Sequence, residues 1–185
     1  VFDRPMSAIA GLSLVAGIAV AETLERLGVR GIALKWPNDV VVDGRKLSGI
    51  LVEASGEANG PATAVVGVGL NVHLPAAVGR TIDQPWIDLR SLGLSGVGRN
   101  ALAAALIDAL IDSCASYARH PLADFLPRWR QYDALRDRMV QLHVSGTLRE
   151  GRYLGVATSG AVRIETSAGL EEHLAGEVSL RYAGA

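Results

Sequence analysis

Two short segments carry two cations and an acid at a spacing that suits work on phosphates. Residues 35–39 read Lys-Trp-Pro-Asn-Asp, and residues 46–51 read Lys-Leu-Ser-Gly-Ile-Leu. Preorganised cations stabilise the negative charge that moves during phosphoryl chemistry. We therefore interpret Lys35, Asp39 and Lys46 as a candidate catalytic group. The structural alternative is that Lys46 is an ordinary solvated lysine after a turn.

Local chain signals predict that a hairpin brings these charges together. Pro37 fixes its own φ and pushes the preceding residue toward an extended conformation, so a strand over 31–36 should end there and present residues 38–39 on a turn. A second strand follows, and Asp43-Gly44 is a strong signal for turning it back. We expect the hairpin to return Lys46 to the side of the other two charges.

Four ordered motifs between residues 35 and 181 resemble those of the bacterial biotin protein ligases. The first joins residues 35–39 to residues 45–53, Arg-Lys-Leu-Ser-Gly-Ile-Leu-Val-Glu. Residues 67–72, Gly-Val-Gly-Leu-Asn-Val, resemble the family's Gly-x-Gly-x-Asn strand. Residues 84–89, Gln-Pro-Trp-Ile-Asp-Leu, resemble its adenylate-loop tryptophan segment, and residues 176–181, Gly-Glu-Val-Ser-Leu-Arg, resemble its C-terminal signature.

The resemblance implies an enzyme that uses ATP, biotin and Mg²⁺. Such a ligase joins the biotin carboxylate to the α-phosphate of ATP, releases pyrophosphate, and transfers biotin from biotinyl-5′-adenylate to a lysine of a biotin carboxyl carrier protein. The implied fold is α+β, a partial class II synthetase-like core with a mixed or antiparallel sheet and covering helices, followed by a small SH3-like β-barrel. The metal ligands stay unassigned.

The resemblance also implies roles for individual residues. Lys46 reaches the biotin carboxyl region and the phosphate. The chemistry of the two steps adds Lys35 as the cation that neutralises the outgoing phosphates, and Asp39 as the carboxylate that accepts the proton of the attacking lysine or holds its ammonium group. Glycines let a ligand approach the sheet backbone; the candidates that line the biotin slot are Gly49, Gly67 and Gly69. The remaining adenylate contacts come mainly from the resemblance: Asn71 to phosphate or a magnesium-bound water, Trp86 stacked on adenine, and Arg181 over the nucleotide.

Structural alternatives accompany several of these residues. A tryptophan before a proline is usually a packing residue, which is the interpretation that we favour for Trp36. Trp86 alone is equally compatible with a core position. Paired glycines at 67 and 69 also mark bulges or close helix packing, and Arg181 near a terminus is by default exposed.

The rest of the chain predicts the elements that position this site. With 185 residues, 49% apolar and 20% charged, the chain suits one domain or one domain plus an appendage. We divide it into a catalytic region over 1–136, incomplete at its N-terminus, and a barrel over 137–185. The expected helices are one that ends at Gly28, Asn100–Arg119 with Asn100 as N-cap, and Leu122–Tyr132. The expected strands are 31–36, 46–54 and 63–72, then Val140–Val144, Thr147–Ala157, Ala161–Glu165, Leu170–Leu174 and Val178–Tyr182. Residues 75–84 are expected to form a loop.

Composition argues against several other classes. A net charge of −1 disfavours DNA binding, which needs a basic face. The apolar N-terminal segment imitates a signal peptide, but its pattern continues to Leu27, so we predict a core helix and no membrane contact. Cys114 is expected to be a packed thiol in a reducing cytoplasm. The four histidines have no metal-ligand spacing, so we predict no zinc site.

The family's upstream Ser-Thr-Asn segment and Gly-Arg-Gly-Arg-x-Gly-Arg loop are both missing from the sequence, which begins at Val1. We therefore expect the C-terminal part of a longer ligase. Two alternatives stay open: a lipoate or octanoyl transferase, and a non-catalytic fragment that binds a carrier or forms a homodimer through a sheet edge. An in-frame arginine-glycine loop upstream of Val1 would favour the ligase.

Overall fold

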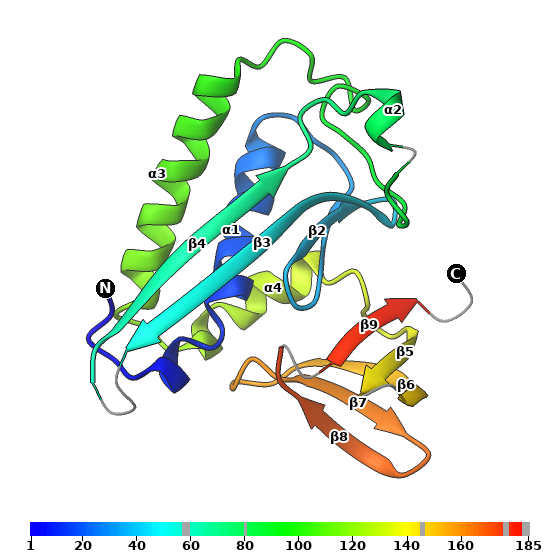
Figure 1. The fold of residues 1–185 in the computed structure, drawn as a ribbon. Coiled ribbons are helices and arrows are strands. Elements are labelled where there is room, and N and C mark those ends of the chain that lie inside the picture. Colours follow the sequence, from blue (N-terminus) through cyan, green and yellow to red (C-terminus); the bar gives the residue numbers. More distant parts are fainter. Residues whose placement is uncertain (57–59, 80, 145–146, 176–177, 183–185) are drawn as a thin grey trace.

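In the first half of the chain, four strands form an antiparallel sheet (Figure 1). The computed structural model describes residues 1–56, 60–79, 81–144, 147–175 and 178–182. The strands pair in chain order, and the long strands β3 and β4 run side by side. The predicted strands are therefore confirmed, together with the short second strand of the hairpin. Their bounds are β1 Ile32–Lys35, β2 Asp39–Val42, β3 Arg45–Gly56 and β4 Ala62–Leu70.

The predicted turn between β2 and β3 is also confirmed. Asp43 and Gly44 both have positive φ angles, 51° and 73°. Two successive left-handed residues produce the turn whose twist matches that of the flanking strands, and Asp-Gly adopts it readily. The hairpin thus follows from the two residues at its tip.

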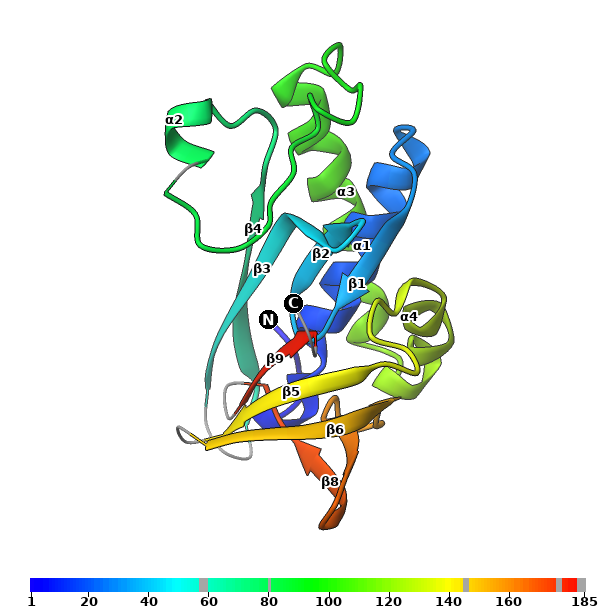
Figure 2. The ribbon, with the colours of Figure 1, turned by 90° about the vertical axis from the view of Figure 1, so that its right-hand side faces the viewer.

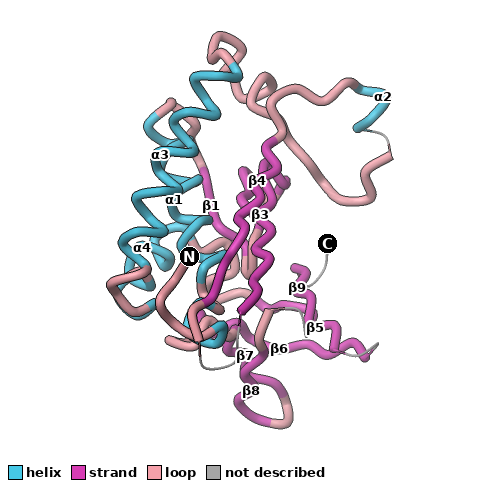
Figure 3. The backbone as a smooth tube through the Cα atoms, turned by 60° about the vertical axis from the view of Figure 1, so that its left-hand side comes forward, coloured by secondary structure: helices cyan, strands magenta, loops and turns pink. Residues whose placement is uncertain are grey.

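Three helices cover one face of this sheet, and no helix of the described residues covers the other face (Figure 3). They are α1 Leu12–Arg26, α3 Arg99–Tyr117 and α4 Leu126–Tyr132. Leu12, Val15 and Leu24 of α1 are at most 1% exposed, and burying each large apolar side chain contributes about 1.5–3 kcal/mol. By length and composition the stretch Met6–Arg26 passes for a membrane span, but most of it is buried inside the protein. The prediction of a core helix is confirmed.

Some predicted element boundaries are wrong. A separate 3-10 helix, Met6–Ile9, precedes α1. Helix α3 starts before Asn100. Gly98 is its N-cap residue, and the Gly98 carbonyl accepts a hydrogen bond from the N–H of Leu102. The predicted helix over 122–132 is divided into a 3-10 turn, Leu122–Asp124, and α4. The predicted loop over 75–84 contains a short helix, α2 Ala76–Gly79.

A second antiparallel sheet follows, at the end of the first sheet near α4 (Figure 2). Its order is β8-β7-β6-β5-β9, so the predicted strands are confirmed, whereas a closed barrel is not found among the strand pairings of the described residues. Strands β8 and β9 lie at opposite edges because each bonds to one neighbour. The bounds are β5 Met139–Val144, β6 Thr147–Val156, β7 Val162–Thr166, β8 Gly169–His173 and β9 Val178–Tyr182.

Trp36 joins the two sheets. Its side chain is 1% exposed, and its indole Nε1–H donates a hydrogen bond of 3.1 Å to the carbonyl of Gly160, in the turn between β6 and β7. Gly160 in turn packs closely against the backbone of Gly11 at the start of α1. The interpretation of Trp36 as a packing residue is therefore confirmed.

Candidate functional site

A row of paired residues crosses the sheet at the level of the predicted site. Lys35 of β1 lies opposite Asp39 of β2, Asp39 lies opposite Gly49 of β3, and Gly49 lies opposite Gly69 of β4. Directly opposite residues in antiparallel strands share one face of the sheet. Leu34, the neighbour of Lys35, is buried against α1 on the helix side, so the row lies on the face without helices.

Lys46 lies over this row and pairs with Asp39. The Lys46 Nζ is 2.6 Å from Asp39 Oδ1, and the two side chains are 31% and 16% exposed. A Cβ at position 49 would lie only 3.1 Å from Lys46 Cε and 3.2 Å from its Nζ. Gly49 thus leaves the space that the lysine occupies, and the hairpin brings Lys46 to Asp39 as predicted. A partly exposed pair adds about 0.2–1 kcal/mol of stability, so its main effect is to orient both charges.

Two cavities adjoin this ion pair. One, of about 400 Å³, lies between Lys46, the glycines 49 and 69, Asn71 and Trp86. The other, of about 500 Å³, continues along the sheet past Gly67 and shares Lys46 and both glycines with the first. Small-molecule pockets commonly have volumes of about 300–1,000 Å³. The glycines predicted for the biotin slot therefore line a space of suitable size, and Lys46 lines both cavities.

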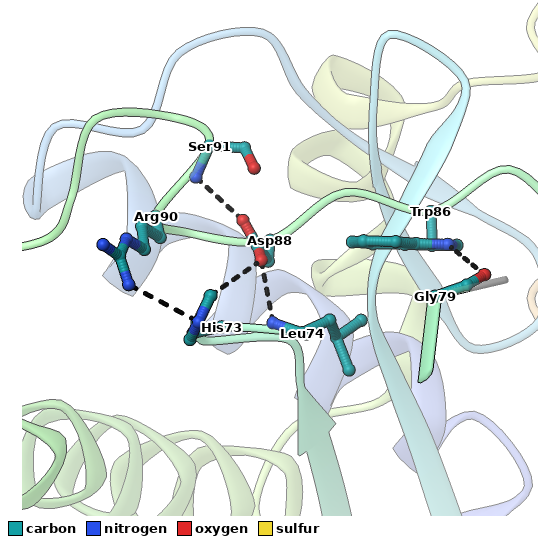
Figure 4. Close-up of a pocket in the computed structure, with 7 residues that line it drawn as sticks. All are labelled: His73, Leu74, Gly79, Trp86, Asp88, Arg90 and Ser91. Atoms are coloured by element: carbon teal, nitrogen blue, oxygen red, sulfur yellow. Dashed lines mark hydrogen bonds and ion pairs between the residues drawn. The ribbon is translucent and has the colours of Figure 1, made fainter. Parts of the chain in front are cut away.

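The segment around Trp86 forms one wall of the first cavity. The Lys46 N–H donates to the carbonyl of Pro85 at 2.9 Å, and the Ile87 N–H donates to the carbonyl of Lys46 at 3.0 Å. The Trp86 Nε1–H donates to the carbonyl of Gly79 at 2.9 Å. A Cβ at position 79 would lie 2.0 Å from the indole ring, so only glycine allows this contact (Figure 4).

Asn71 has a role that the sequence did not indicate. Its Nδ2 donates hydrogen bonds of 3.1 Å to the carbonyls of both Lys46 and Ile87. The side-chain amide therefore ties the start of β3 to the Trp86 segment. The predicted contact of Asn71 with phosphate or a metal-bound water stays a prediction.

Replacing Asn71 with leucine should lower the free energy of unfolding by about 1–3 kcal/mol, because two carbonyls lose a shared donor. Urea denaturation followed by circular dichroism measures this change. Asn100→Leu, at an exposed asparagine, should stay within about 0.5 kcal/mol of the wild type. Equal destabilisation by both substitutions would contradict the assigned role of Asn71.

A second polar cluster, which sequence reasoning missed, lies on the other side of Trp86 (Figure 4). The Asp88 side chain is 4% exposed and accepts hydrogen bonds of 2.8 Å from the backbone N–H groups of Leu74 and Ser91. His73 Nδ1 is 3.7 Å from the same carboxylate. Burial alone would raise the pKa of Asp88, but the hydrogen bonds with Ser91 and Leu74 and the nearby His73 together lower it.

An aspartate three residues before a serine in a turn is a signal that could have indicated this cluster. In the sequence motif of residues 84–89, this aspartate is a flank of the tryptophan. Its partner Leu74 lies 14 residues earlier, so a local pattern could not predict the longer contact.

The remaining candidate residues are placed less completely. Arg181 has its backbone in β9, opposite Gln141, while its side chain lies outside the described part, as do residues 176–177 of the C-terminal motif. Within the described part, no group of three or more His, Cys, Asp or Glu side chains could hold a metal ion. Burial raises the pKa of the Cys114 thiol, in agreement with a packed cysteine.

Comparisons with known proteins identify relatives along nearly the whole chain. Residues 3–71 match the model of the Biotin/lipoate A/B protein ligase family. The chain is 38% identical to the bifunctional ligase/repressor BirA of Salmonella typhimurium over 97% of its own length, and 38% identical to the biotin--[acetyl-CoA-carboxylase] ligase of Mycobacterium tuberculosis over 60%. It covers 55% and 40% of these proteins, so it spans about half the length of such relatives.

Solved structures agree with these matches. The apo biotin protein ligase of Aquifex aeolicus superposes with a TM-score of 0.82 at 25% identity, over 96% of this chain and 77% of that one. The same ligase in complex with biotin and ATP gives a TM-score of 0.79 at 25% identity, over 95% and 72% of the two chains. The chain is therefore similar to the biotin protein ligases in sequence and in fold along nearly its whole length.

Proposed function

We propose that this chain carries the site of an ATP-dependent ligase that attaches biotin to a lysine of a biotin carboxyl carrier domain through biotinyl-5′-adenylate. The observation that carries the proposal is the Lys46–Asp39 pair, held at 2.6 Å over Gly49 and beside a cavity walled by Trp86. A structural relative of this chain is described in complex with biotin and ATP, which supports the same substrates here.

In the first step, an oxygen of the biotin carboxylate attacks the α-phosphorus of ATP. The new bond is the carboxyl–phosphate bond of the mixed anhydride, and the bond to the β-phosphate breaks to release pyrophosphate. Lys46, which lines both cavities, supplies positive charge where negative charge develops. Lys35, at the end of the same row, faces the departing phosphates. Mg²⁺ commonly binds through substrate phosphates, and we propose that it arrives with ATP to neutralise their charge.

In the second step, the carrier lysine attacks the carbonyl of the adenylate, and AMP leaves. The attacking amine must be neutral, whereas a free lysine is almost wholly protonated near pH 7. Asp39 is 16% exposed and already lies against one ammonium group. When Lys46 turns to the phosphate, Asp39 takes the incoming lysine as its partner and accepts its proton.

Asp39→Asn should slow transfer from preformed biotinyl-5′-adenylate by about 10²-fold, because the general base is lost. Single-turnover transfer to a carrier domain isolates this step from adenylate formation. Asp43→Asn serves as the matched control, since Asp43 is exposed in the neighbouring turn and 74% of its side chain is accessible. An unchanged transfer rate in Asp39→Asn would remove Asp39 from this role.

The whole reaction is tested with ATP, magnesium and a carrier domain, and with lipoate offered in place of biotin. The assay compares the 185-residue chain with a chain extended upstream in the same reading frame. Biotin transfer by either chain, with lipoate rejected, supports the proposal. Transfer of lipoate would establish the sister activity instead. Failure of both chains to transfer biotin or to bind biotinyl-5′-adenylate would overturn the proposal.

We propose a boundary between residues 136 and 137, with an SH3-like unit over 137–185 whose Arg181 covers the nucleotide. The carrier domain is the protein partner, a homodimer forms through a sheet edge, and the enzyme acts in the cytoplasm without DNA or membrane contact. The separate five-stranded sheet supports the boundary, and the relatives named as carboxylase ligases support the partner.

A further inference from the structure

After β4 the chain leaves the sheet in an excursion that begins after Leu74 and returns beside the sheet at Trp86, which bridges to Lys46. The two ends of this excursion are joined by backbone hydrogen bonds, from Leu89 N–H to the Asn71 carbonyl at 2.9 Å and from Arg90 N–H to the Val72 carbonyl at 3.2 Å. Beyond these bonds, the buried carboxylate of Asp88 spans the remaining gap. One oxygen accepts the Leu74 N–H, immediately before the excursion, and the other accepts the Ser91 N–H after it.

Figure 4 shows the Asp88 carboxylate between these two backbone groups, with His73 and Arg90 on its outer side and the Trp86 ring over Gly79. Arg90 Nη1 lies 3.4 Å from His73 Nε2. A cavity lies beside Asp88, and Trp86, two residues from Asp88, lines it. Trp86 also lines the cavity that Lys46 lines. The segment that carries Trp86 is therefore held at Lys46 by backbone hydrogen bonds, and two residues further on by the contacts of Asp88.

We infer that Asp88 is a positioning residue for the nucleotide half of the site. Its carboxylate closes the excursion at Leu74 and Ser91, and so holds the Trp86 ring as a wall beside Lys46. This inference rests on the proposed function, because it assigns the Trp86 wall to the nucleotide part of the adenylate.

The chemistry of the carboxylate explains why an aspartate suits this position. An ionised carboxylate offers two oxygens that only accept, so each can take one backbone N–H. An asparagine of the same shape has one such oxygen, and its amide would direct N–H groups at a backbone N–H. Hydrogen bonds to a charged acceptor are also about twice as strong as neutral ones.

Tryptophan fluorescence provides a test that needs no ligand. Trp36 and Trp129 are each 1% exposed, whereas Trp86 is partly exposed, so acrylamide quenching reports mainly on Trp86. Asp88→Asn should increase the quenching and shift the emission maximum to longer wavelength. The matched control is Asp83→Asn, at an exposed aspartate of the excursion, which should leave both unchanged. Unchanged quenching in Asp88→Asn would overturn the inference, whatever the ligase assays show.

Steady-state kinetics separate positioning from general destabilisation. We expect Asp88→Asn to raise the KM for ATP about tenfold, because one charge-assisted hydrogen bond is lost. The KM for biotin should stay within about twofold of the wild-type value. Equal increases in both KM values would assign Asp88 a merely structural role and overturn the inference. If neither the 185-residue chain nor its upstream-extended form has ligase activity, the proposed function fails in the transfer assay, and the quenching result alone decides the position of Trp86.

A variant that fails to fold does not end the test. Asp88→Glu keeps both acceptor oxygens on a side chain one methylene longer, so it should give a smaller increase in quenching than Asp88→Asn. If Asp88→Asn is unfolded by circular dichroism, quenching of Asp88→Glu identical to the wild type would overturn the inference.

Discussion

Replacing Lys46 with methionine should lower the rate of biotin attachment by about 10²–10³-fold, the usual cost of removing one preorganised charged or donor group from a transition state. Methionine keeps much of the side-chain volume above Gly49 and removes only the ammonium group. The loss should appear in kcat for adenylate formation, measured as biotin-dependent pyrophosphate release. The expected reason is that the cation faces the phosphate in the transition state more closely than in the bound substrates.

Arg45→Gln is the matched control for Lys46→Met. Arg45 precedes Lys46 on the same strand, but it is exposed and pairs with Asp43 in the turn. Removing this neighbouring positive charge should change the rate less than about threefold, because exposed charges are screened by solvent. Similar losses from both substitutions would mean that net positive charge, rather than the position of the Lys46 ammonium, supports the reaction.

Replacing Trp36 with alanine should lower the free energy of unfolding by about 3–5 kcal/mol, the usual range for deleting a large buried aromatic side chain. The indole is 1% exposed and lies where the two sheets meet. Urea denaturation monitored by circular dichroism measures the loss. Such a change is a large part of the stability of a typical domain.

Trp36→Phe distinguishes ring packing from the hydrogen bond to Gly160. Phenylalanine keeps an aromatic ring but cannot donate to the Gly160 carbonyl, so this variant should lose about 1–3 kcal/mol. A loss from Trp36→Ala smaller than about 1 kcal/mol would show that the contact between the sheets contributes little to stability.

The hairpin and the charges that it carries could be predicted from the sequence because local chemistry determines them. Pro37 ends β1, and Asp43-Gly44 adopts the two positive φ angles of the turn. Strand pairing then places Lys35 opposite Asp39, and a shift of register between Val40 and Val41 accompanies the approach of the Lys46 side chain to Asp39. The buried α1 helix was equally predictable, because its apolar pattern and its end before Gly28 are both local features.

The rest of the site depends on contacts between distant segments. Asn71 donates to carbonyls 25 and 16 residues away, and Asp88 accepts from a residue 14 positions earlier. Nothing in the local sequence specifies such partners. The N-cap of α3 was misplaced for a different reason: Asn is a strong N-cap residue, but the observed N-cap is Gly98, two residues before Asn100.

The row from Lys35 to Gly69 takes one residue from each strand of the first sheet. Side chains alternate between the two faces of a strand, so a slip of one residue between β2 and β3 would turn Asp39 or Gly49 toward the helices and bring apolar side chains to the open face. A changed turn length would therefore displace several members of the row at once, whereas a substitution changes one side chain. Among natural variants, single-residue insertions or deletions in the turn at Asp43-Gly44 should be rarer than substitutions within the row.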